Sequence, residues 1–255
     1  MKRQPAKRAA AVAAAPATLS FIKHMEQTLR AAPPKQKGLR TRQRLKIATA
    51  KVLERDGYHA MRVSDISATA ELAEGSFYVY FKDKTDASLT VLRELLEDFM
   101  SQGIDSDTER EPIEAIRAAN RRWLAVCRAN AGLARCILQL GDEDPDLSRL
   151  ARRVNRDWLE RVVHSSAKRR GSNRGANAAM LAAYLMGGMM DELVRKLIIY
   201  PDPQFLELLT ELKADDDAVA DAASVVWLRV FHPDARPPKD LPPAAMALVD
   251  WIWTP

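Results

Sequence analysis

The amino-acid sequence predicts an all-α protein, with a small N-terminal three-helix domain followed by a larger helical domain. Apolar side chains recur at the spacing of a helical face over almost the whole chain, and no segment shows the strict alternation of a half-buried strand. Proline and glycine stand mainly between these periodic segments, where they end one helix before the next begins. The 255 residues are 47% hydrophobic and 29% charged, which is typical of a globular protein with a sizeable core.

Residues 1–37 form an extension that is rich in Ala, Lys, Arg and Pro. We expect its first sixteen residues to be disordered and Thr18–Ala31 to form a short amphipathic helix that Pro33 and Pro34 end. One face of this helix would carry Leu19, Ile22, Met25 and Leu29. A secretory signal is the alternative interpretation, because basic residues precede an Ala-rich stretch, but Ala9–Ala15 is short and weakly apolar.

No apolar run approaches the roughly 18 residues that a membrane-spanning helix needs. The two cysteines, Cys127 and Cys136, lie in a segment predicted to be helical, and neither belongs to a CxxC pair. We therefore expect both to be buried, reduced thiols. Together these features predict a cytoplasmic protein that does not contact a membrane.

After the extension, a long helix is predicted over Leu39–Asp56, and Gly57 ends it. Two short helices follow at Ser64–Ala70 and Glu74–Tyr80, with a tight turn at Glu71–Ala73 between them. Two short helices joined by such a turn can cross closely, and the second can enter the major groove of DNA. The apolar residues expected to pack the pair together and onto the long helix are Ile66, Ala70, Leu72, Phe77 and Phe81.

The rest of the chain is predicted to be a series of longer helices. Asp83 is a suitable N-cap for a helix over Lys84–Met100, and Pro112 suits the first position of another that reaches Asn130. The further helices are predicted at Gly132–Leu140, Leu147–Val162, Ala176–Ile199, Gln204–Lys213 and Asp215–Phe231. The basic segment Lys168–Gly175 is expected to be a loop, and Pro233–Pro255 an irregular, Pro-rich tail.

Charge is distributed unevenly along the chain. Residues 1–64 hold 15 Lys and Arg against 3 Asp and Glu, whereas the remainder holds 24 against 31. The net charge is thus +12 at the front and −7 behind it. This asymmetry is expected when only one end of a protein meets a polyanion such as DNA.

Residues Arg40–Leu89 resemble the N-terminal domain of the TetR family of bacterial regulators, without a gap. The residues that match the family pattern are Thr41, Arg42, Ala48, Gly57, Tyr58, Ala60, Val63, Asp65, Ile66, Ala70, Gly75, Ser76, Phe77, Tyr78, Tyr80, Phe81 and Lys84. The resemblance implies that Ser76, Tyr78 and Tyr80 face DNA and that Lys84 holds a phosphate. Gly75 would let the second helix approach the DNA backbone closely. Arg40, Arg42 and Arg62 are further candidates for phosphate contacts.

The sequence also departs from the family pattern. Glu71 stands in the turn where the family usually has Gly, and Ala73 stands where it usually has a capping Ser or Thr. Glu74 brings negative charge toward the DNA, and Arg62 replaces another common cap. The loss of one cap costs about 1 kcal/mol. We hypothesise that the basic extension compensates by contacting phosphates or the minor groove; an uninvolved tail is the alternative.

The resemblance further implies a C-terminal domain that dimerises and binds an effector. The dimer would form through Ala176–Ile199 and Asp215–Phe231, where Ala178, Ala179, Ala182, Ala183, Gly187 and Gly188 allow close helix packing. A small, largely apolar effector would lie among Trp123, Cys127, Trp158, Tyr184, Met186, Met189 and Met190, although large apolar residues at helical spacing more often form an ordinary core. The predicted divisions are residues 1–37, 38–85 with the helix-turn-helix at 62–81, 86–232 and 233–255.

The predicted function is therefore ligand-responsive binding of double-stranded operator DNA by a homodimer, as a repressor that its effector releases. Activation of transcription stays open, as does a ligand-independent DNA-binding dimer with a solid core. An enzyme is not expected, because the four histidines are scattered and no catalytic triad, P-loop or GxGxxG pattern is present. For the same reasons no metal and no cofactor is expected.

Overall fold

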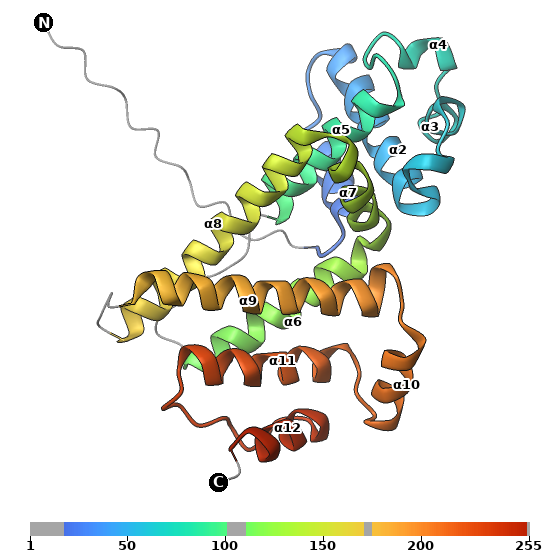
Figure 1. Ribbon diagram of the computed structural model, residues 1–255. Coiled ribbons are helices and arrows are strands. Elements are labelled where there is room, and N and C mark those ends of the chain that lie inside the picture. The colour runs from blue at the N-terminus through green and yellow to red at the C-terminus, as the bar shows by residue number, and fades with distance from the viewer. Residues whose placement is uncertain (1–17, 101–110, 171–174, 254–255) are drawn as a thin grey trace, which may run out of the picture.

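The computed structural model describes residues 18–100, 111–170 and 175–253, and over these ranges it contains helices and no strand. The all-α prediction is therefore confirmed for the described residues (Figure 1). The expected disorder of the first sixteen residues lies outside them. Part of the loop expected at Lys168–Gly175 does so as well, and the preceding helix continues to Arg170.

The N-terminal part begins with α1 (Phe21–Ala31), which is capped by Ser20 and buries Phe21 and Met25. Leu19 precedes this helix and is exposed, so its predicted place on the apolar face is wrong. The three helices that we call the head are α2 (Lys37–Ala60), α3 (Val63–Thr69) and α4 (Glu74–Phe77). Gly57 breaks the regular part of α2 with a φ of 76°, which confirms its predicted role.

The head is joined to the rest by α5 (Lys84–Glu94), which Asp83 caps through a 2.8 Å bond to the amide of Asp86. This helix continues as a π-helical turn, η1 (Leu95–Met100). The elements that we call the body are α6 (Pro112–Ala129), α7 (Ala131–Glu143), α8 (Pro145–Arg170), α9 (Ala176–Val194), η2 (Arg195–Ile199), α10 (Pro203–Glu211), α11 (Asp216–Phe231) and α12 (Pro243–Trp253).

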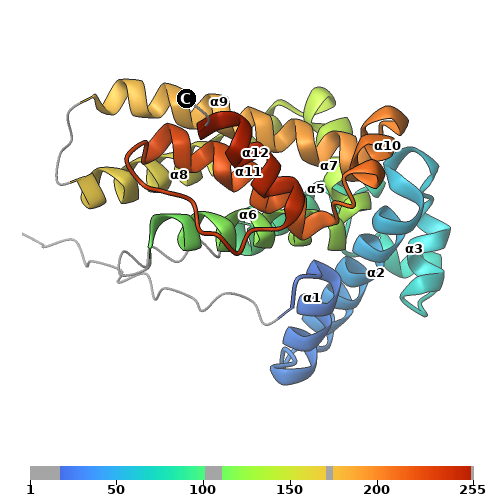
Figure 2. The same ribbon diagram turned by 90° about the horizontal axis from the view of Figure 1, so that it is seen from below.

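The C-terminal segment is not the irregular tail that the sequence suggested. Pro243 occupies the first turn of α12, where a missing N–H costs nothing, and a segment that is apolar except for Asp250 follows it. Ala245 and Leu241 pack with Val225 of α11, and the Arg229 guanidinium lies 5.0 Å from the centre of the Trp253 ring. Residues 243–253 therefore belong to the body. Figures 1 and 2 show α12 beside α11, with the head at the far end of the molecule.

One hydrophobic core runs from the head into the body. It joins buried residues of α1, α2, α3, α4, α5 and η1 to others on α7 and α8, including Phe77, Phe99, Leu133 and Leu147. Two further clusters fill the body around Leu197 and around Trp227. The head is thus packed directly on the body in addition to being tethered by α5.

Candidate nucleic-acid interface

The helix-turn-helix is held together by the apolar residues that the sequence singled out. Ile66, Phe77 and Phe81 are buried, and the rings of Phe77 and Phe81 lie 5.6 Å apart. Ala70 is buried beside them and Leu72 is half-buried against the same core. The predicted packing is confirmed. The second helix is shorter than predicted, because regular α-helix ends at Phe77 and a turn covers residues 78–80.

The turn between α3 and α4 contains a residue in the left-handed region. Glu71 has a φ of 54°, which explains why glycine is favoured at this position in the related pattern. Arg44 of α2 steadies the turn: its Nη2 donates to the Ala70 carbonyl at 2.6 Å and lies 3.8 Å from the Glu71 carboxylate. Ala73 provides no side-chain cap for α4, as expected from its methyl group.

The residues predicted to read DNA lie on the outer side of α4 and the turn after it. Tyr78 is 56% exposed, and Ser76 is half-buried. A Cβ added to Gly75 would meet no atom within 4 Å, so the surface there is open to a close partner. Tyr80 is different, because its ring packs partly on the core and its hydroxyl faces the backbone of Gly38.

Three of the four predicted phosphate-binding cations already make side-chain contacts within the protein. Arg40 donates to the carbonyls of Pro34 and Lys35 at 2.9 and 2.8 Å, and the Arg42 guanidinium lies 5.1 Å from the centre of the Phe81 ring. Arg62 is exposed at the start of α3, where its backbone N–H donates to Asp65. Lys35 and Lys37, at the end of the basic extension, are exposed, and so is Lys82 between α4 and α5, which sequence reasoning did not single out.

Among the predicted phosphate-binding cations, Lys84 makes the most contacts within the protein. Its Nζ donates to the carbonyls of Tyr58, His59 and Met61 at 3.1–3.4 Å and lies 4.9 Å from the centre of the Tyr58 ring. A lysine at the C-terminal end of a helix satisfies carbonyls that have no partner within that helix. In this structure Lys84 therefore fixes the end of α2 against the start of α5.

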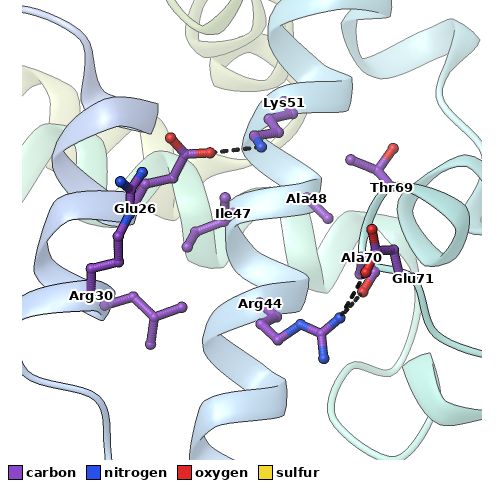
Figure 3. Close-up of a pocket in the computed structure, with 10 residues that line it drawn as sticks. Glu26, Arg30, Arg44, Ile47, Ala48, Lys51, Thr69, Ala70 and Glu71 are labelled. Atoms are coloured by element: carbon purple, nitrogen blue, oxygen red, sulfur yellow. Dashed lines mark hydrogen bonds and ion pairs between the residues drawn. The ribbon is translucent and has the colours of Figure 1, made fainter.

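A groove of about 330 Å³ lies between α1, α2 and the turn of the helix-turn-helix (Figure 3). Glu26 and Lys51 form an ion pair of 2.7 Å on the α1 side, while Arg44 reaches Ala70 and Glu71 on the other side. The groove separates the C-terminal half of α1 from the turn between α3 and α4. Helix α1 therefore contacts the head through α2.

The head meets the body where α2 crosses the start of α7. The Glu54 carboxylate accepts hydrogen bonds from the backbone amides of Gly132 and Leu133 at 3.1 and 2.9 Å, which caps α7. A Cβ on Gly132 would lie 2.1 Å from the Glu54 carbonyl oxygen, so only glycine allows this approach. We call this contact the junction. The separation of Glu54 and Gly132 along the chain hides it from sequence patterns.

Six of the seven residues predicted to bind an effector lie in the two body clusters. Cys127 belongs to the Leu197 cluster, Trp123 to both clusters, and the others to the Trp227 cluster; these others are Trp158, Met186, Met189 and Met190. Tyr184 is not brought together with them, because it lies on the outer face of α9 and is 46% exposed. None of the seven lines the groove of Figure 3 or a second groove between Arg93 and Arg153.

The body contains two polar features that the sequence did not reveal. Asp221 of α11 is fully buried and accepts hydrogen bonds from Arg117 and Arg121 of α6 at 2.6–3.2 Å. Burial alone would raise the pKa of Asp221, but the two guanidinium groups outweigh it and hold the pKa below its ordinary value. The second feature is the buried indole N–H of Trp227, which has no hydrogen-bond partner among the described residues.

The outer face of α9 is apolar and uncovered. Leu181 and Leu185 are 63% and 62% exposed, and Gly188 lies on the same face. On α11, Val219 and Ala223 are buried, whereas Val230 is 40% exposed. Within the described ranges, no helix is long and apolar enough to cross a membrane.

Comparisons with known proteins agree with this geometry. Residues 47–86 match the model of the family described as bacterial regulatory proteins, tetR family. A 55-residue segment is 34% identical to the fatty acid metabolism regulator protein of Bacillus subtilis (strain 168). That segment is 22% of this chain and only 28% of the relative's length.

Two solved structures share the fold more broadly. The fatty acid degradation regulator FadR from Bacillus halodurans aligns over 80% of this chain and 100% of its own, with 20% identity and a TM-score of 0.55. A TetR-family transcriptional regulator from Mesorhizobium loti MAFF303099 aligns over 77% and 98%, with 19% identity and a TM-score of 0.54.

The fold and the site thus define an all-helical protein with an N-terminal helix-turn-helix domain. Residues 47–86 carry the domain that the tetR family model describes, and the likeness to the two solved structures, at 20% and 19% identity, shows a shared fold.

Proposed function

We propose that this chain is a homodimeric repressor that binds double-stranded operator DNA and that a small, largely apolar effector releases it. The observation that carries the proposal is the open surface of α4 around Gly75, Ser76 and Tyr78, set on a buried helix-turn-helix core. Tyr78 and Ser76 would contact bases or phosphates, while exposed Lys35 and Lys37 supply positive charge at the start of α2.

The roles of the other predicted DNA-binding residues are divided in this proposal. Arg62 is exposed and free to approach a phosphate, whereas Arg40, Arg42 and Lys84 act first by shaping the head through the contacts described above. Tyr80 would support the N-terminal end of α2 near Gly38. Only the exposed groups are then expected to contribute to the dependence of affinity on salt.

The proposed dimer forms through the uncovered face of α9 and the exposed C-terminal end of α11. Leu181, Leu185 and Val230 would bury their apolar surface against a second copy, and Gly188 would allow the helices to approach. Leu185→Arg should give a monomer by light scattering. Leu208→Arg, at a residue that is 48% exposed on α10, is the matched control and should leave the dimer intact.

The proposed effector site is the Trp227 cluster. Methionine side chains can repack around an apolar guest, and the unpartnered Trp227 N–H would donate to a carbonyl or carboxylate of that guest. The two fatty-acid regulators named above suggest the class to test first, namely a fatty acid. A ligand-independent dimer is the second candidate, favoured by the grooves found at the surface, which none of the predicted effector residues lines.

The experiment selects operator fragments from genomic DNA with the full chain and then titrates the selected fragment. Tyr78→Ala should weaken binding at least tenfold, because it removes the most exposed aromatic of the reading surface. Tyr200→Ala is the control, since Tyr200 is similarly exposed but lies in the body. Stearate is then added; release of the parent from the operator and weaker release of Trp227→Phe support the effector site. Equal binding by Tyr78→Ala and the control would refute the DNA surface.

A further inference from the structure

Helix α1 lies before the segment that matches the family model, and it contacts three parts of the molecule. It packs along α2 of the head, against η1 at the end of α5, and on the turn between α6 and α7 of the body. Figure 2 shows it beside α2. A single helix with these three contacts is placed to govern how the head sits on the body.

The contact with the body is made by one buried side chain, Asn130, at the turn between α6 and α7. Its Oδ1 accepts a hydrogen bond from the Phe21 amide at 2.8 Å, and its Nδ2 donates to the Leu19 carbonyl at 2.8 Å. The same Nδ2 donates to the Val126 carbonyl at 2.7 Å, which fixes the side chain on α6. The amide group thus supplies a donor and an acceptor to the backbone where α1 begins.

The contact with α5 is aromatic. Phe99 of η1 is buried, and its ring centre lies 5.6 Å from those of both Phe21 and His24. A π-helical turn at the end of a helix often marks a functional position, because its wider backbone leaves room for rearrangement. The rings of α1 cover the point where the helix leaving the head becomes irregular.

The contact with the head is the Glu26–Lys51 ion pair on α2, together with the buried Met25. The groove of Figure 3 keeps the rest of α1 away from the helix-turn-helix turn. Helix α1 therefore contacts the head through α2, which is the longest helix of the head.

We infer that α1 is a clamp that fixes the angle between head and body, with Asn130 as the positioning residue. The inference rests on the proposed function, in which an effector in the body changes the spacing of two DNA-binding heads. Release of the Asn130 contacts frees α1 from the body while it stays on α2. The head then depends on the junction and α5 alone, and it samples a wider range of angles.

The test measures the distance between head and body within one protomer. Nitroxide labels are placed at Ala68→Cys on α3 and Asp157→Cys on α8, both exposed, in full-length protein diluted with an excess of unlabelled parent. Cys127 and Cys136 are buried and should not react. Pulsed electron paramagnetic resonance gives the distance distribution in the parent and in three variants, without DNA or effector.

Asn130→Ala and Phe21→Ala approach the clamp from its two sides, and Asn155→Ala is the matched control, at an exposed site on α8. The clamp predicts that both test variants broaden the distribution, to about twice its width in the parent, and that the control does not. Phe21→Ala leaves the α6–α7 turn intact. Its distance distribution therefore tests the clamp even if Asn130→Ala destabilises the body. Parental widths in folded Phe21→Ala, with or without broadening in Asn130→Ala, would overturn the inference. The proposed function is tested by binding to operator DNA, so the clamp and the proposed function can fail independently of each other.

Discussion

The junction between head and body and the α6–α11 contact inside the body are both held by a carboxylate, but the partners differ. At the junction Glu54 accepts from backbone amides of Gly132 and Leu133, and the two backbones nearly touch. Between α6 and α11, Asp221 accepts from the side chains of Arg117 and Arg121, which can follow small movements. The junction should therefore be intolerant of added volume, whereas the α6–α11 contact should be sensitive to lost charge.

The largest effect is expected from Gly132→Ala. The new methyl group would meet the Glu54 carbonyl at 2.1 Å, so α2 and α7 must move apart. We expect the free energy of unfolding to fall by about 3 kcal/mol or more, measured by urea denaturation at one protein concentration. Gly141→Ala, on the same helix but with no atom near the added methyl, is the control. Equal stability of the two variants would mean that α2 and α7 can move apart at the junction with little loss of free energy of unfolding.

A somewhat smaller loss is expected from Asp221→Asn. The substitution removes the only buried negative charge between Arg117 and Arg121, and both guanidinium groups reach partly into solvent, which softens the loss. We expect about 2 kcal/mol in the same assay. Asp217→Asn alters an exposed neighbour of Arg121 and should cost far less. A loss no greater than that of the control would show that the buried charge adds nothing.

The pH dependence of stability provides an independent check on the same carboxylate. Because the pKa of Asp221 is lowered in the folded protein, its stabilising contribution is complete above the ordinary value of 3.8 and is lost as the pH falls through the folded pKa. The difference in unfolding free energy between parent and Asp221→Asn should be constant near neutral pH and shrink below pH 3.8. A difference that grows on acidification would contradict this assignment.

The smallest effect is expected from Glu54→Gln. The amide oxygen can still accept one backbone hydrogen bond, and the head and body remain in close contact, so about 1 kcal/mol should be lost. Glu143→Gln, exposed at the end of α7, should be neutral. If Glu54→Gln matched Asp221→Asn in urea, the junction would depend on charge as strongly as the α6–α11 contact does.

The parts of the fold that follow from local sequence were predicted correctly. Helix starts at Asp83, Pro112 and Asp215 lie where capping and proline rules put them, and Gly57 ends the regular part of α2. The helix-turn-helix was recognisable because its core residues and turn are contiguous. Glu71, which departs from the family pattern, proved to adopt the positive φ that the pattern implies.

Features that depend on distant residues were not predictable. Phe21 and Asn130 are 109 positions apart, and nothing near Asn130 indicates that it binds the start of a helix. The engagement of Lys84 with three carbonyls depends on where α2 ends in space. Helix α12 was missed because the prolines before it hid an apolar segment that is stable only against α11.

The two cysteines give the protein a pair of natural reporters. Burial raises the pKa of Cys127 to about 12 and that of Cys136 to about 11, so both thiols stay protonated and unreactive near neutral pH. Cys136 lies under the junction, with its Sγ 3.8 Å from the Leu53 carbonyl, whereas Cys127 lies in the Leu197 cluster of the body. The rate at which a thiol reagent modifies Cys136 would therefore report opening of the junction, and the rate for Cys127 would report opening of the body. Both can be measured in a protein that carries no added label.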